Sequence, residues 1–186
     1  MKIKNLISTI TLATVLMLGT TAMAQDTKMV GGAEMYPSKD IVSNAVNSKD
    51  HTTLVAAVKA ADLVETLQGE GPFTVFAPTN AAFDKLPEGT VSTLLMKENK
   101  EKLQAVLTYH VVSGKYSAED IIKAIKKGDG KATFKTVNGA TLTAMMDGKN
   151  VVLMDNAGNK SKVTISDVNQ SNGVIHVVDT VVLPGM

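Results

Sequence analysis

The chain has no cysteine, no arginine and no tryptophan among its 186 residues, and these absences exclude several kinds of structure and partner. Without cysteine there is no disulfide and no lipid on an N-terminal cysteine, so stability must come from a packed core. Without arginine the chain lacks the residue that reads bases and phosphates through two parallel hydrogen bonds. The sequence therefore does not indicate nucleic acid as a partner.

Long hydrophobic runs are missing except near the start of the chain. Lys2 and Lys4 precede the mostly apolar segment Leu6–Leu18, and Ala22-Met23-Ala24 follows it. This order is typical of a secretory signal peptide over residues 1–24, cut after Ala24. Because the apolar segment is too short to cross a bilayer about 30 Å thick, we expect a secreted or periplasmic protein with no membrane span after cleavage.

An excess of one charge is also missing from the mature chain. Without Lys2 and Lys4 it has 19 − 2 = 17 lysines against 18 acidic residues, a net charge of 17 − 18 = −1. Residues 25–37 contain two glycines among polar residues and predict a flexible N-terminal arm. Residues 38–184 are enough for one domain with its own core.

Patterns for catalysis and metal binding are absent too. No Gly-x-Ser-x-Gly sequence presents a serine nucleophile. The three histidines lie far apart in the sequence, and Asp155–Asn159 has too few acidic residues for a calcium loop. We therefore predict no enzyme activity, no metal and no cofactor.

The spacing of apolar residues divides the chain into a first part with helical periodicity and a second part with the periodicity of strands. Apolar residues at helical spacing predict helices over about 38–47, 53–67, 91–96, 99–108 and 117–127. Brief strands are predicted at 73–77 and 109–112, and from Lys131 a period of two predicts strands over about 132–137, 140–146, 151–154, 162–167 and 173–183. We predict an α+β fold, helix-rich in its first half and antiparallel β in its second, with the strand at Phe73 joining the later sheet.

Aromatic residues are few, and three of the four phenylalanines lie within Gly71–Phe83. The first half of this segment is apolar or β-branched without polar alternation, which predicts a strand buried on both faces. Pro78 stops the strand, and Thr79 or Asn80 can cap a following helix. We assign this strand-to-helix corner to the core of the fold.

Three segments resemble the fasciclin domain family, in order and at the expected separations over about Ile41–Pro184. The corner matches the first family motif, and its residues are Phe73, Thr74, Val75, Phe76, Ala77, Pro78, Thr79, Asn80 and Phe83. Tyr109-His110 matches a second landmark. The run Asn172–Asp179, with Asn172, Gly173, His176 and Asp179, resembles the second motif. The resemblance implies a wedge-shaped, β-sandwich-like core decorated by helices and an extracellular or cell-surface role rather than catalysis.

The resemblance also indicates candidate binding residues. In animal members the tyrosine–histidine pair and an aspartate–isoleucine pair are linked to integrin binding, and the matching positions here are Tyr109, His110, Asp167 and Val168. Val168 departs from the pattern, so we do not carry over receptor specificity. His176 is a further candidate, because it is a polar residue deep in an apolar run. We hypothesise that His110 and the second motif form one polar clamp inside the core.

These observations predict an exported, non-catalytic binding domain. We expect it to contribute to cell adhesion, or to association with the cell surface or extracellular matrix, through protein or polysaccharide contacts. One alternative is a periplasmic carrier of a small ligand or lipid, held in a groove between the sheet and the N-terminal helices. A further alternative is an exported hydrolase.

Overall fold

The computed structural model describes residues 26–185, so the predicted signal peptide, Met1–Ala24, lies outside the described residues. In chain order the elements are β1 (Lys28–Val30), β2 (Ala33–Met35), α1 (Ile41–Ala45), the 3-10 helix η1 (Lys49–His51), α2 (Thr52–Ala60), α3 (Val64–Gln68), β3 (Phe73–Pro78), α4 (Asn80–Asp84), α5 (Thr90–Leu94), the 3-10 helix η2 (Lys97–Asn99), α6 (Lys100–Tyr109), β4 (Val111–Ser113), α7 (Ala118–Lys127), β5 (Lys131–Lys135), β6 (Thr141–Asp147), β7 (Asn150–Met154), β8 (Lys160–Gln170) and β9 (Gly173–Val178). No helix within 26–185 is long and apolar enough to cross a membrane.

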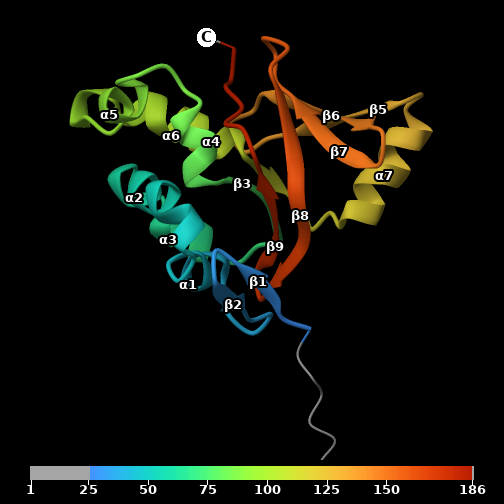
Figure 1. Ribbon diagram of the computed structural model, residues 1–186, viewed down its shortest axis with the longest axis horizontal. Helices are drawn as coiled ribbons and strands as arrows, with labels where there is room; N and C mark the ends of the chain where they lie inside the picture. The colour runs from blue at the N-terminus through green and yellow to red at the C-terminus, as the bar shows by residue number, and fades with distance from the viewer. Residues whose placement is uncertain (1–25, 186) are drawn as a thin grey trace, which may run out of the picture.

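Seven strands form one sheet in the order β4-β3-β9-β8-β7-β6-β5. All neighbours are antiparallel except β3 and β9, which are parallel. The two ends of the sheet meet through a bridge between Val112 and Thr136 and a 2.8 Å hydrogen bond from the Val137 amide to the Val111 carbonyl. The sheet is therefore nearly closed, with α1–α6 on one side of the central strands and α7 beside β5–β7 (Figure 1). The predicted α+β fold is confirmed.

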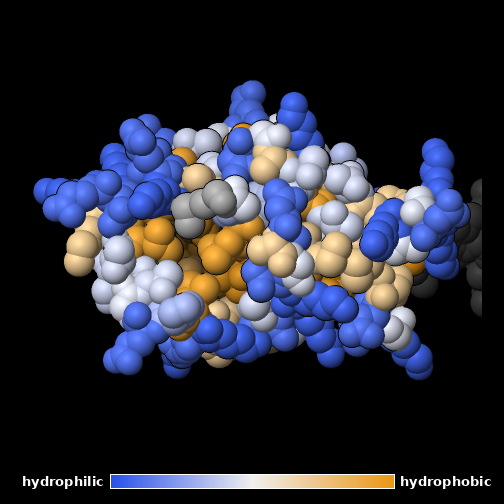
Figure 2. All heavy atoms as spheres, turned by 90° about the horizontal axis from the view of Figure 1, so that it is seen from above, coloured by the Kyte–Doolittle hydropathy of each residue, from blue (hydrophilic) through white to orange (hydrophobic). Residues whose placement is uncertain are grey.

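Two clusters of buried side chains flank β3, which is why the sequence of this strand is apolar throughout. Val75 and Ala77 belong to the helix-side core, formed with α1–α4 and α6. Phe76 points the other way into the sheet-side core, which also contains side chains from α7, β5, β6 and β7. The predicted strand with both faces buried is thus confirmed. Seen from the end where the chain finishes, hydrophobic side chains gather on the helical side, with hydrophilic ones around them (Figure 2).

The parallel pairing of β3 with β9 explains one glycine of the second motif. Gly173 lies opposite Phe73 in the register. A Cβ atom at this glycine would lie 2.1 Å from the Phe73 carbonyl oxygen, closer than any side chain can approach. The two motifs are therefore neighbours in the sheet, and β9 can pair here only because its first residue is a glycine.

The prediction of a flexible arm over residues 25–37 is wrong for most of that segment. β1 and β2 form an antiparallel hairpin whose Val30 and Met35 are buried in the helix-side core. The Lys28 ammonium donates a 2.7 Å hydrogen bond to the Ser166 carbonyl of β8. The two glycines that indicated flexibility form the tight turn, where both have positive φ angles. They are turn residues of an ordered hairpin.

The single helix predicted over 53–67 is interrupted. α2 ends at Ala60, and Asp62 takes a left-handed conformation with φ of 55°. The Leu63 amide donates to the Val58 carbonyl and the Asp62 amide donates to the Lys59 carbonyl, which together make a Schellman termination. A separate helix, α3, follows and ends at the C-cap Gly69.

Candidate functional site

The Tyr109-His110 pair turns inward at the end of α6. Tyr109 is the last helical residue and His110 is the C-cap, so the strand predicted over 109–112 begins only at Val111. Tyr109 is fully buried, and its hydroxyl donates a 2.9 Å hydrogen bond to the Thr141 carbonyl of β6. Burial, reinforced by the charge of Asp155, raises the pKa of Tyr109.

His110 joins three segments of the core. Its Nε2 accepts a 3.2 Å hydrogen bond from the Val182 amide, so the proton sits on Nδ1, which donates to the Val106 carbonyl at 2.8 Å. The His110 carbonyl accepts from the Phe76 amide of β3 at 2.9 Å. The hypothesis of one clamp with the second motif needs correction, because the His110 ring binds the segment after that motif. Burial lowers the pKa of His110 to about 4.

His176 makes a separate connection from the middle of β9. Its Nδ1 accepts from the Asp167 amide at 3.3 Å, so Nε2 carries the proton and donates to the Tyr116 carbonyl at 2.8 Å. The ring stacks on Phe76 with 5.6 Å between the ring centroids. Burial lowers the pKa of His176, an effect that the Tyr116 carbonyl and the charge of Asp167 oppose. The residue is completely buried.

Asp167 and Val168 lie at an irregular part of β8, where the register against β9 shifts between Ile165 and Val168. Asp167 has a positive φ of 55°, and its Oδ1 accepts a 2.7 Å hydrogen bond from the Ala118 amide at the start of α7. Val168 points into the helix-side core and is 1% exposed. Asp167 therefore fixes the position of α7, while Val168 fills the core.

The polar residues of both motifs also bind backbone groups. Thr79 caps α4 as predicted, while Asn80 accepts from the Thr53 amide and so caps α2 instead. Asn172 accepts from the Ile41 amide at 3.1 Å and donates to two carbonyls around the end of α3. Asp179 accepts from the Lys162 amide at 2.9 Å. The motifs join distant elements, in agreement with the assignment of the corner to the core.

Several buried polar residues were missed at the sequence level. Asn44 binds the backbone of Tyr36 and the side chain of Gln170, which connects α1 to the N-terminal hairpin and β8. Asp155 accepts from the Leu183 amide as well as from its own turn. An asparagine within the apolar period of α1 was the available signal for Asn44. Within 26–185 no three acidic or histidine side chains gather as a metal site.

The outer face of the sheet carries a group of lysine side chains. Side chains alternate between the two faces of a strand, and those of β5–β7 that do not enter the sheet-side core point outward. The strand register aligns two outward rows across β5, β6, β7 and β8, namely Lys131, Met145, Val152, Lys162 and Thr133, Thr143, Met154, Lys160. Lys135 extends the same face along β5. We call these nine residues the lysine face.

The lysine face carries positive charge at two of its sides. Strands lie about 4.8 Å apart, so Lys131 and Lys162 are separated by roughly 14 Å across the sheet. Val152 in the middle is buried without belonging to either core cluster, which places it beneath the longer side chains around it. Asp147 is the acidic residue on the same side of β6, so the charges sum to 4 − 1 = +3.

Comparisons with known sequences place the chain in a family. The model of the fasciclin domain family matches residues 49–184. Protein sll1483 of Synechocystis sp. is 49% identical over 159 residues, which cover 85% of this chain and 81% of that protein. The cell surface glycolipoprotein MPB83 of Mycobacterium bovis is 34% identical over 166 residues, covering 87% of this chain and 68% of that protein. The chain belongs to the fasciclin domain family.

A solved structure agrees with this assignment. The FAS1 domain pair from the insect cell adhesion molecule Fasciclin I matches with a TM-score of 0.70 at 20% identity, over 80% of this chain. The chain spans about half of that domain pair, 52% of its length. The match shows the fold. Fasciclin domains thus occur in a cell adhesion molecule and in a mycobacterial cell surface glycolipoprotein.

Proposed function

We propose that this chain is an exported, non-catalytic binding domain that associates with the cell surface or matrix through acidic polysaccharide. The observation that carries the proposal is the lysine face. Its four lysines surround threonine and methionine side chains on the outer side of the sheet, and a linear polyanion that crosses these strands can contact several ammonium groups at once. The surface location named for MPB83 and the adhesion role named for Fasciclin I support association with a surface.

The family-motif residues are less suitable for direct contact with a partner. Tyr109, His110 and His176 are buried and use their polar atoms inside the fold. Asp167 holds the start of α7. In contrast, all four lysines of the lysine face are exposed, and within residues 26–185 the ion pairs closer than 4 Å involve other lysines. Their charges are therefore available to an anionic polymer.

Binding to immobilised alginate, a polyuronate, tests the proposal, with neutral dextran as the reference polymer. The chain from residue 25 should be retained on alginate at low salt and released as ionic strength rises, because salt screens charges on an exposed face. Lys131→Gln with Lys162→Gln should reduce retention strongly. Thermal unfolding would confirm that the double variant remains folded.

The matched control is Lys126→Gln with Lys127→Gln, which removes the same charge from exposed lysines of α7 that are outside the ion pairs found within residues 26–185. It should be retained almost as well as the wild type. Equal losses in both double variants would show a response to net charge alone and would refute the lysine face as the binding surface. Retention on dextran equal to that on alginate would refute acidic polysaccharide as the partner.

A further inference from the structure

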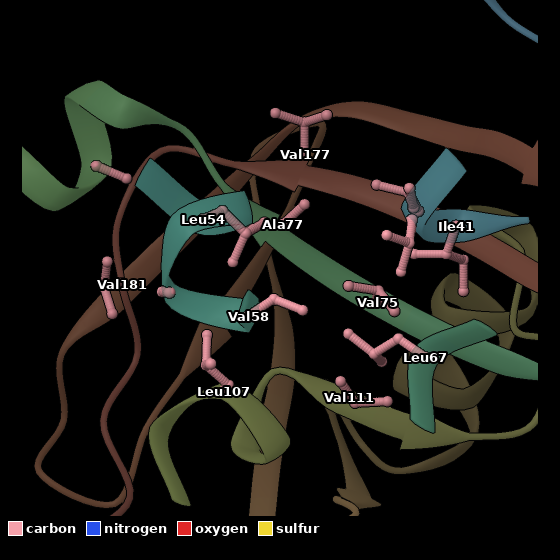
Figure 3. Close-up of a cluster of buried hydrophobic side chains, with 14 of the residues drawn as sticks. Ile41, Leu54, Val58, Leu67, Val75, Ala77, Leu107, Val111, Val177 and Val181 are labelled. Atoms are coloured by element: carbon pink, nitrogen blue, oxygen red, sulfur yellow. The ribbon is translucent and has the colours of Figure 1, made fainter. Parts of the chain in front are cut away.

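The helix-side core contains an apolar cavity of about 60 Å³ between the first helices and the sheet. Its lining comes from α1, α2, α3, β3, α6, β4 and β9, together with Val137. Figure 3 shows representatives of these elements pointing toward a shared space, namely Val58 of α2, Leu67 of α3, Val75 of β3, Leu107 of α6 and Val111 of β4. The position corresponds to the groove that the sequence suggested for a carrier.

The cavity offers no hydrogen-bonding group to a guest from its inner polar residues. Both ring nitrogens of His110 already bind backbone groups. The Thr108 hydroxyl donates to the Gln104 carbonyl at 2.6 Å. A water molecule in a buried site needs two to four polar partners, so this space favours an apolar guest over water. Engineered apolar cavities of roughly 150 Å³ bind benzene, and a smaller one admits fewer carbon atoms.

The mouth of the cavity has a different character. Val55 is half-buried there, while Lys59, Thr66 and Val137 are exposed. Lys59 is the cationic residue among the lining side chains, and the ion pairs found within 26–185 do not include it. An apolar interior whose mouth is lined by a lysine side chain is complementary to a molecule with an alkyl tail and an anionic head, because the aliphatic stem of the lysine can contact the tail while its flexible end reaches the head.

We propose that the cavity binds the alkyl end of a small linear carboxylate, with its carboxylate beside Lys59. The terminal carbons enter the space between Val58, Leu67 and Val111, and the rest of the chain passes Val55. This site lies among the helices and does not involve the lysine face, so the inference is independent of the polysaccharide proposal.

Titration with sodium octanoate, followed by amide chemical shifts and calorimetry, tests the site. Octanoate should bind saturably, with shifts concentrated on α2, α3 and β3, and butyrate should bind more weakly because its tail is shorter. Lys59→Gln should weaken octanoate binding about threefold, as expected for an exposed charge contact, and leave binding of 1-octanol unchanged. Lys126→Gln, on the exposed side of α7, is the matched control and should bind octanoate like the wild type.

Closing the cavity provides the second arm of the test. Val58→Phe fills the interior of the cavity. Val55→Phe narrows the half-buried mouth, so the site can still be tested with this variant if Val58→Phe does not fold. Loss of octanoate and octanol binding in a folded variant supports the site. Octanoate shifts scattered over surface lysines, or binding unchanged in Val55→Phe, would overturn it. Equal octanoate affinity in Lys59→Gln and wild type would overturn the placement of the carboxylate.

Discussion

At the residue scale, the histidines are buried neutral groups. His51, His110 and His176 are all buried, and burial lowers the pKa of each. In His110 and His176 one ring nitrogen accepts from a backbone amide and the other donates to a backbone carbonyl. A second proton on either ring would point a ring N–H at the backbone N–H that now donates to it, and that hydrogen bond would be lost. Each of these rings therefore connects its segments only while it is neutral.

The stability of the protein should therefore fall as the pH is lowered from about 6.5 to about 4. An unfolded histidine has a pKa of about 6.5, while that of folded His110 is about 4. Between these values the unfolded state takes up a proton that the folded state excludes, and above them the full stability is present. His110 alone contributes a loss of about 3 kcal/mol over this range. Urea unfolding at several pH values measures the effect.

The variant His110→Gln separates this residue from the other titrating groups. It should be less stable than the wild type at pH 7, because the hydrogen bonds to Val106 and Val182 are disturbed. Its unfolding free energy should change less between pH 6.5 and 4. A variant with the full acid dependence of the wild type would contradict the assignment.

At the element scale, the start of α7 depends on two carboxylates. Ser117 and Asp120 form a capping box, with each side chain accepting from the backbone amide of the other residue. Asp167 of β8 adds a third contact by accepting from the Ala118 amide at 2.7 Å. The bulge in β8 thus fixes where α7 begins.

Asp167→Ala should lower the unfolding free energy by about 2 kcal/mol. The substitution removes a helix-capping acceptor and places alanine in the left-handed region, each at a cost of about 1 kcal/mol. Asp167→Asn should lose less than half of that, since asparagine tolerates this conformation and keeps an oxygen acceptor. Urea unfolding measures the difference as a shift of the midpoint, with the slope of unfolding free energy against urea concentration unchanged. Equal losses in the two variants would argue against capping by this residue.

The sequence predicted elements best where one residue type determines the backbone. The helix start at Ser117 and the strand over Phe73–Ala77 were predicted correctly for this reason. The break after α2 was missed because aspartate, rather than glycine, takes the left-handed position at Asp62. The helical spacing of apolar residues continues across that break, so a prediction from periodicity alone treated α2 and α3 as one helix.

At the scale of the whole molecule, the N-terminal hairpin is part of the core. Met35 is 2% exposed and packs in the helix-side core, whereas Met29 on the same hairpin is 61% exposed. Met35→Ala should therefore lower the unfolding free energy by about 2–4 kcal/mol, and Met29→Ala should change it by less than about 0.5 kcal/mol. Thermal or urea unfolding measures both. Identical stabilities for the two variants would show that the hairpin does not pack.

The candidate sites depend on tertiary structure in a way that the sequence did not reveal. The family landmarks were recognised from local motifs, but the inward direction of Tyr109 and His176 follows from their partners in other elements. Lys131 and Lys162 are 31 residues apart, and only the register across β5–β8 brings them onto one face. The cavity likewise forms between helices and strands from both halves of the chain, so no single stretch of sequence predicted its volume or its mouth.

The pairing of β3 with β9 also bears on when the fold can form. Phe73 is paired with Gly173, 100 residues later in the chain. Without β9, one edge of β3 is unpaired and the core beneath the helices lacks the β9 side chains that belong to it. Contacts of such separation form slowly, because the intervening chain must first be ordered. A chain synthesised from its N-terminus therefore cannot pair both edges of β3 until β9 has been made, and the sheet-side and helix-side cores stay incomplete until then.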